Sequence, residues 1–150
     1  MRQNLAGVLH RVAPLGLVLL VVSACHIKLV SDYDDNFVQA AVSTEKEIST
    51  LLQNLRNPPI GTDITYKGNI ANYNKVDVDM NHLAVLSSSH ENNAASIAQV
   101  NKVIEIVHGL ETLHRDNTTL SPAFVTQKQQ DIDLAFAIVI RTENDKKAGM

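Results

Sequence analysis

Apolar side chains recur every three or four residues along four stretches of the chain, and this spacing predicts four amphipathic helices. The first stretch covers residues 33–57. Its apolar seam consists of Phe37, Ala41, Thr44, Ile48, Leu51 and Leu55. Pro58 and Pro59 follow it, and because proline disfavours helical geometry in the residue before it, we expect the helix to end there.

The second stretch, residues 63–87, has the same periodicity but a less favourable composition. Its seam consists of Tyr66, Ile70, Tyr73, Val76, Met80, Leu83 and Ser87. Asp63 is a suitable N-cap residue, whereas Gly68 and several asparagines are poor helix formers. Residues 75–80 also alternate between polar and apolar side chains, as a strand does. We favour a helix, because the longer seam would otherwise be accidental, but the pattern does not decide whether it is continuous.

The third and fourth stretches have clearer boundaries. The third, residues 93–115, follows a connector rich in serine and asparagine, which are good N-cap residues. Its apolar face consists of Ile97, Val100, Val103, Ile104, Val107 and Leu110. Ser121 and Pro122 mark the start of the fourth helix, since proline is favoured at the first helical position. The fourth seam consists of Val125, Ile132, Ala135, Phe136 and Val139.

Four helices with short connections predict an all-α fold, an antiparallel four-helix bundle over residues 33–150. If the helices alternate in direction, one end holds the start of the first helix, the loop around His90 and the C-terminus. The opposite, outer end holds the turn at 58–59, the start of the fourth helix and His114. Counting 100° per residue places His114 near the middle of the apolar face of the third helix, so we expect it to be buried.

The first 24 residues have the three parts of a secretory signal peptide. Arg2 and Arg11 supply a basic start, an apolar run covers residues 12–22, and small residues follow. A helix that spans a bilayer needs roughly 20 apolar residues, about twice the length of this run. We therefore expect residues 1–24 to be removed, and we expect something other than peptide to anchor the protein.

The run 22–25, Val-Ser-Ala-Cys, resembles the lipobox of bacterial lipoproteins, in which an apolar and two small residues precede a cysteine. The resemblance implies cleavage before Cys25, a diacylglyceryl thioether on its sulfur, and a further acyl chain such as palmitate on the new amino group. Two acyl chains already give stable anchoring, so this anchor would be effectively permanent. Residues 25–32 then form a lipidated tether ahead of the bundle. The alternative is an ordinary cleaved signal peptide with a free thiol at Cys25.

His26 follows the cysteine, where lipoproteins retained in the inner membrane of enteric-type bacteria usually have aspartate. The resemblance therefore favours the outer membrane, with the protein facing the periplasm. Three further segments resemble a group of small, helical, functionally uncharacterised bacterial lipoproteins. They are 28–34 (Lys-Leu-Val-Ser-Asp-Tyr-Asp), 110–114 (Leu-Glu-Thr-Leu-His) and 120–122 (Leu-Ser-Pro). This resemblance implies no catalytic residues.

Composition narrows the functions that the bundle can have. The chain has 13 basic and 16 acidic residues, and both bases of the signal segment are lost with it, so a basic surface for nucleic acid is not expected. Cys25 is the only cysteine, which excludes a disulfide within the chain. Tryptophan is absent and aromatic content is 4%, which argues against a carbohydrate-stacking surface.

Glu111 and His114 form a Glu-x-x-His pair, the spacing by which di-iron bundles bring a carboxylate and an imidazole to one metal ion. Such a site needs a second pair and two further inward glutamates. The nearest second pair, Asp79 and His82, is predicted to point away from the seam. We therefore interpret His114 as a buried histidine, hydrogen-bonded to a group such as the Tyr66 hydroxyl. Its expected neighbours are Leu52, Leu55, Tyr66 and Phe124.

These patterns predict a non-enzymatic, membrane-anchored module of the bacterial envelope. It would contact the membrane through lipid on Cys25 and an envelope protein through a helix face or the outer end, with no cofactor. The alternative is a helical bundle that binds a small ligand or a metal ion near Glu111 and His114. No catalytic motif in the chain predicts an enzyme.

Overall fold

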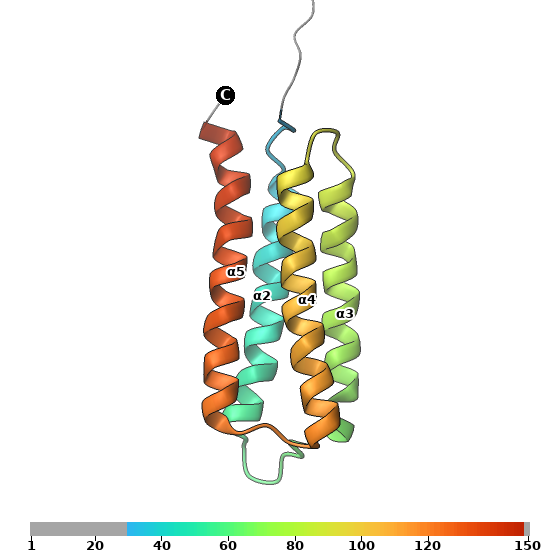
Figure 1. Cartoon of the computed structure of the whole chain (residues 1–150), viewed down its shortest axis with the longest axis vertical. Helices are drawn as coiled ribbons and strands as arrows, with labels where there is room; N and C mark the ends of the chain where they lie inside the picture. The colour runs from blue at the N-terminus through green and yellow to red at the C-terminus, as the bar shows by residue number, and fades with distance from the viewer. Residues whose placement is uncertain (1–29, 149–150) are drawn as a thin grey trace, which may run out of the picture.

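The computed structural model describes residues 30–148, and within them the chain forms four α-helices and no strand. They are α2 (Asp35–Arg56), α3 (Tyr66–Ser88), α4 (Ala94–Asn117) and α5 (Pro122–Ala148). The helices lie side by side and alternate in direction (Figure 1). The predicted all-α, antiparallel four-helix bundle is therefore confirmed.

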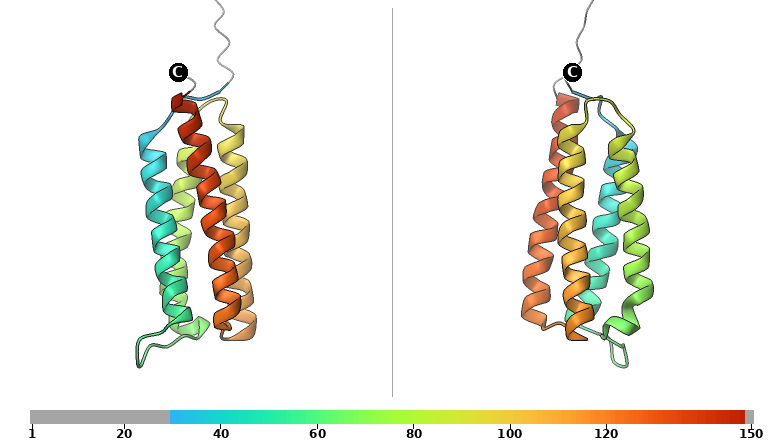
Figure 2. Two further views of the ribbon diagram at one scale, coloured as in Figure 1. Left: turned by 90° about the vertical axis from the view of Figure 1, so that its left-hand side faces the viewer. Right: turned by 45° about the vertical axis from the view of Figure 1, so that its right-hand side comes forward.

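Each helix packs against two neighbours, since α2 and α4 both contact α3 and α5. Segment 30–34, the α3–α4 loop and the last turn of α5 lie together at one end, which we call the base (Figure 2). The α2–α3 and α4–α5 loops lie at the outer end. The ends therefore hold the segments that alternating helices predicted for them.

The predicted seams form the core of the bundle. Its fully buried apolar residues are Phe37, Ala41, Ile48, Leu51, Leu52, Leu55, Tyr73, Val76, Met80, Leu83, Val100, Val103, Val107, Leu110, Val125, Ile132, Phe136 and Val139. Seam residues Ile97, Ile104 and Ala135 are half-buried at its edges. Each of the four helices has one apolar stripe, and packing the stripes together in a core removes all of them from water.

Helix α3 is continuous from Tyr66 to Ser88, so the helix prediction for residues 75–80 is confirmed over the strand alternative. Its N-cap is Thr65, and the prediction of Asp63 was wrong. Thr65 Oγ1 accepts the Gly68 N–H at 3.2 Å, whereas Asp63 Oδ1 accepts the Thr65 N–H one turn earlier. A Cβ on Gly68 would lie 2.5 Å from the Asp63 carboxylate, which explains a glycine in this first turn.

One residue of the predicted α3 seam is wrong. Ile70 is 40% exposed, and Asn69 takes the buried position beside it. The Asn69 amide nitrogen donates to the carbonyl oxygens of Asp63 and Thr65, both at 2.9 Å. Burial of this polar side chain is offset because it satisfies backbone acceptors where the chain enters the helix.

The predicted signal peptide (1–24), Cys25 and the first part of the tether lie outside the described residues. Within residues 30–148, none of the helices has both the length and the apolar character needed to cross a membrane. The part of the tether that is described, residues 30–32, lies at the base.

Candidate functional site

His114 lies in the last turns of α4, completely buried at the outer end, as predicted. The prediction that Tyr66 would be its partner was wrong. Its Nδ1 is 2.9 Å from the Tyr73 hydroxyl, and its Nε2 is 2.9 Å from the carbonyl oxygen of Ile64. Because a carbonyl oxygen can only accept, Nε2 carries the hydrogen, and Nδ1 accepts from Tyr73 in the neutral ring.

The surroundings of His114 favour this neutral form. Burial lowers the pKa of His114, and its hydrogen bonds to the backbone at Ile64 and Thr118 only partly oppose that effect. Burial also raises the pKa of Tyr73, with a further contribution from the negative charge of Glu111. Both side chains therefore remain uncharged near neutral pH.

Tyr66 instead contacts the other member of the Glu-x-x-His pair. Its hydroxyl donates to Glu111 Oε1 at 2.9 Å. This hydrogen bond is the main reason that the pKa of Tyr66 is raised. The Tyr66 ring also packs against the rings of Tyr73 and His114, with centroids 5.7 and 5.9 Å away. Sequence spacing identified this layer but not which tyrosine reaches the imidazole.

The arrangement does not direct Glu111 and His114 to one ligand. The carboxylate of Glu111 accepts from Tyr66, while Nδ1 of His114 accepts from Tyr73 and Nε2 donates to the carbonyl oxygen of Ile64. Across residues 30–148, no three side chains among His, Cys, Asp and Glu form a group that could hold a metal ion. The geometry therefore gives no support to the alternative of a metal site here.

The outer surface at this end is apolar in part. A shallow hollow of about 270 Å³ lies between the end of α4 and the start of α5. It is lined by Leu113, Asn117, Thr119, Leu120, Ser121 and Phe124. In the α2–α3 loop, Ile60 is fully exposed beside Gly61, whose φ of 85° makes the turn. The run Pro-Pro-Ile-Gly was a signal for such a projecting apolar residue.

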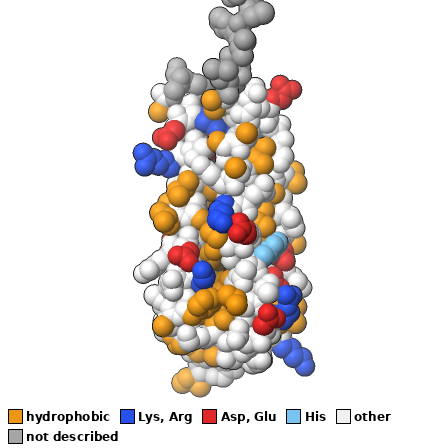
Figure 3. Space-filling view, in the orientation of Figure 1, with side chains coloured by type: hydrophobic (Ala, Val, Ile, Leu, Met, Phe, Trp, Pro, Cys, Tyr) orange, Lys and Arg blue, Asp and Glu red, His pale blue; other side chains and the backbone are white. Residues whose placement is uncertain are grey.

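Apolar side chains also reach the surface along the bundle. Leu113 on α4 and Leu134 and Ile138 on α5 are 41%, 64% and 46% exposed. On the face in Figure 3, apolar patches alternate with side chains of both charges, and no extended basic surface forms there.

The base contains a polar cluster that sequence reasoning missed. Glu143 and Lys146 of α5 form an ion pair with N and O atoms 2.6 Å apart, and their side chains are only 2% and 5% exposed. Position 143 continues the spacing of Ile132, Phe136 and Val139, so the seam itself indicated a buried residue there. A glutamate at a seam position is the signal that was available.

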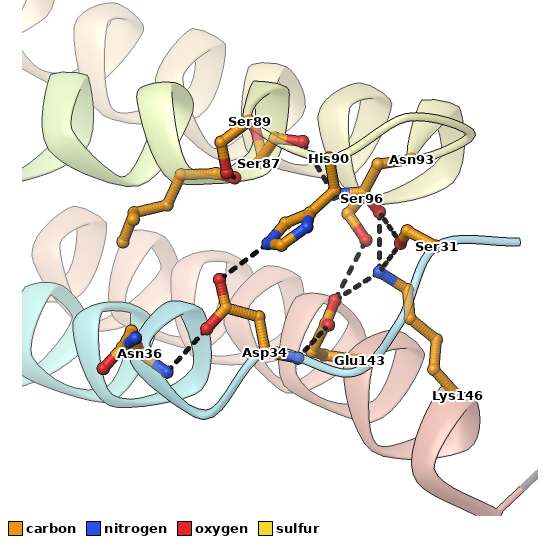
Figure 4. A network of polar contacts seen from close by, with 11 residues as sticks. Ser31, Asp34, Asn36, Ser87, Ser89, His90, Asn93, Ser96, Glu143 and Lys146 are labelled. Atoms are coloured by element: carbon orange, nitrogen blue, oxygen red, sulfur yellow. Dashed lines mark hydrogen bonds and ion pairs between the residues drawn. The ribbon is translucent and has the colours of Figure 1, made fainter. Parts of the chain in front are cut away.

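Lys146 joins three elements at the base (Figure 4). Besides Glu143, its Nζ donates to Ser31 Oγ at 2.8 Å and to Asn93 Oδ1 at 2.6 Å. Ser31 in turn donates to Asn93 Oδ1 at 3.0 Å. The three hydrogens of the ammonium group thus have acceptors on the N-terminal segment, the start of α4 and α5.

Asp34 completes the base from the start of α2. Its backbone N–H donates to Glu143 Oε1 at 2.9 Å, and its carboxylate caps α2 through the N–H of Asn36. His90 Nε2 lies 3.0 Å from the other carboxylate oxygen. Burial raises the pKa of Asp34, but the hydrogen bonds from His90 and from the α2 backbone outweigh it, and the net pKa is lowered.

Comparisons of the chain with protein-family models, with curated proteins and with solved structures find no match. None of the three therefore supplies a ligand, a partner or a catalytic residue for this chain. What the protein does is inferred from its own residues and geometry.

Proposed function

We propose that this protein is a lipid-anchored protein of the bacterial envelope, attached through Cys25, whose bundle is a non-enzymatic interaction or accessory module. The observation that carries the proposal is the Val-Ser-Ala-Cys run at 22–25 behind a basic and then apolar leader. The position of segment 30–34 supports it, because the chain enters the bundle at the base. An anchor on that side would leave the outer end pointing away from the membrane.

His26 after the cysteine favours the outer membrane, and the bundle would then face the periplasm. The outer end is the surface that we assign to a protein partner. Ile60 is fully exposed there, and Leu113 and Leu120 line the hollow at the same end. Apolar side chains at a protruding position are typical anchors of protein interfaces.

Acyl labelling with membrane fractionation tests the anchor. The wild-type chain is expected to take up labelled fatty acid and to sediment with the membranes. The Cys25→Ser chain is expected to take up no label and to be released. Equal sedimentation of both chains, with no label in either, would contradict a lipid anchor.

Site-specific photo-crosslinking in intact cells tests the partner surface. A photoreactive residue at position 60 is expected to capture one envelope protein in a discrete band. The matched control carries the same residue at position 42, where Val42 is 48% exposed on α2. Equal capture from both positions, or no band from position 60, would contradict a partner site at the outer end.

A further inference from the structure

The cluster at the base holds a segment that belongs to no helix. Residues 30–34, which we call the strap, cross the base before α2 begins. Ser31 is bonded through its side chain to Asn93 and Lys146, and its N–H donates to the carbonyl oxygen of Asn92 at 3.3 Å. The N–H of Asp34 donates to Glu143. Every one of these contacts reaches α5, α4 or the loop before α4.

The strap contacts centre on a buried ion pair, and burying two charged groups is energetically unfavourable. Removing an ammonium and a carboxylate from water costs several kcal/mol for each ion, and the cost is recovered only when hydrogen bonds satisfy both groups. Lys146 uses all three of its donors here. The two Glu143 oxygens accept from Asp34, Ser96 and Lys146. Ser31 and Asp34 of the strap therefore supply hydrogen bonds that offset the desolvation cost of the buried pair.

Further contacts hold the same segment from the outside. The Tyr33 hydroxyl donates to Asp35 at 2.6 Å, and the ammonium group of Lys147 lies 4.7 Å from the centre of the Tyr33 ring. Asn93 also donates to the carbonyl oxygen of Ser87, which fixes the acceptor that Ser31 and Lys146 share. The strap is therefore held on both its buried and its exposed side.

We propose that Lys146 and Glu143 form a latch that locks the strap across the base, so that the anchored end of the chain is fixed to α4 and α5 as well as to α2. The consequence at the membrane rests on the lipid anchor proposed above, whereas the latch itself does not. With the latch closed, the six steps from Cys25 to Ser31 extend at most roughly 20 Å. With it open, the ten steps to Asp35 extend roughly 35 Å, and the bundle is free to tilt.

Amide hydrogen exchange on the full, lipid-bearing chain in detergent tests the latch. In the wild type, the Ser31 and Asp34 amides are expected to exchange slowly. The Lys146→Met variant is expected to raise exchange in the strap at least tenfold. Lys102→Met is the matched control, because Lys102 also pairs with a glutamate three residues away but is 62% exposed.

Two further variants keep the test decisive if Lys146→Met does not fold. Glu143→Gln combined with Lys146→Met removes both charges and leaves none unpaired. Ser31→Ala removes only the strap side of the contact, and Ser31→Thr, which keeps the hydroxyl, is expected to restore protection. Unprotected strap amides in the wild type would overturn the latch. So would unchanged exchange in Ser31→Ala, or a rise in Ser31→Ala that is as large in the core of α2–α5 as in the strap.

A thiol label separates failure of the latch from failure of the anchor. Val30→Cys introduces a thiol at a position that is 53% exposed, and acylated Cys25 leaves it as the only free one. We expect one spin label per chain, immobile in liposomes and mobile in the Ser31→Ala background. Two labels per chain would contradict the anchor. One label with equal mobility in both backgrounds would contradict the latch.

Discussion

Individual polar side chains in the two end layers decide how this bundle is held together. At the outer end, His114 is buried and neutral between Tyr73 and the carbonyl of Ile64. At the base, Glu143 and Lys146 are buried and charged. A buried polar group is costly once its partner is lost, so each layer depends on single atoms.

Tyr73→Phe removes one oxygen and leaves His114 Nδ1 buried without a donor. We expect a loss of about 1–3 kcal/mol in the free energy of unfolding, measured by urea denaturation. Tyr66→Phe is the control, because Glu111 is half-buried and water can replace the lost hydroxyl, so its loss should be smaller. Equal losses would mean that the Tyr73 hydrogen bond contributes little.

Because its pKa is lowered, His114 makes the free energy of unfolding depend on pH. The unfolded chain takes up the proton first as the pH falls, at the ordinary histidine value of about 6.5. The contribution of His114 is therefore complete above that pH, declines below it, and levels off under the folded pKa. An NMR titration should place the pKa of His114 below 6.5, and a value at or above 6.5 would contradict the hydrogen-bond assignment.

Lys146→Met leaves Glu143 charged and buried, and removal of one partner of a buried ion pair costs about 3–5 kcal/mol. Lys102→Met removes an exposed pair and should cost about 0–1 kcal/mol. Guanidinium denaturation of both variants measures the difference. The double variant Glu143→Gln, Lys146→Met should recover much of the loss, and a double variant as unstable as Lys146→Met would refute the ion-pair explanation.

At the scale of the helices, periodicity predicted the four helices but not the polar residues that cap them or are buried near their ends. The seams are readable because one residue in three or four must face the core whatever the sequence between them. The choice of Thr65 over Asp63 as the cap, and of Asn69 over Ile70 inside α3, depends on where the loop before α3 runs. Such long-range placement leaves no local pattern in the sequence.

For the polar residues of the two end layers too, helical register indicated burial but not the hydrogen-bond partners. The burial of His114 followed from its register on α4, but its partner depended on how α3 turns relative to α4, which spacing alone does not give. Glu143 lies one turn beyond Val139, the last residue of the predicted seam, and was missed because an acid is a poor candidate for burial. Two of its partners, residues 34 and 96, lie far away in the sequence.

The N-cap of α3 can be tested by itself. Thr65→Ala removes the acceptor for the Gly68 N–H and should cost about 1 kcal/mol of unfolding free energy. Thr62→Ala, three residues earlier on the exposed loop, is expected to change stability by less than about 0.5 kcal/mol. If the two substitutions have equal effects on the thermal midpoint, Thr65 does not cap the helix.

At the scale of the whole molecule, the two ends of the bundle differ in how they tolerate change. The loop at the outer end is exposed around Ile60, whereas the loop at the base is tied down through the buried Asn93. Sites of tolerated insertion are exposed segments with few buried backbone contacts.

A Gly-Ser segment inserted between Ile60 and Gly61 should therefore cost little, about 0.6 kcal/mol for each doubling of loop length. The same segment inserted between Asn92 and Asn93 should lower the thermal midpoint much further, because it displaces the acceptor of Ser31 and Lys146. Calorimetry on the two insertions measures the contrast, and equal midpoints would contradict it.

The packing of α2 against α5 has a consequence for the order in which the chain folds. The α2–α3, α3–α4 and α4–α5 contacts each join helices that are neighbours along the chain, so these contacts close short loops and form quickly. The α2–α5 contact joins the first helix to the last, and until it forms the buried faces of both remain open to water. We therefore expect the arrival of α5 to be the committing step, and a chain that ends before Pro122 to remain an open, aggregation-prone intermediate.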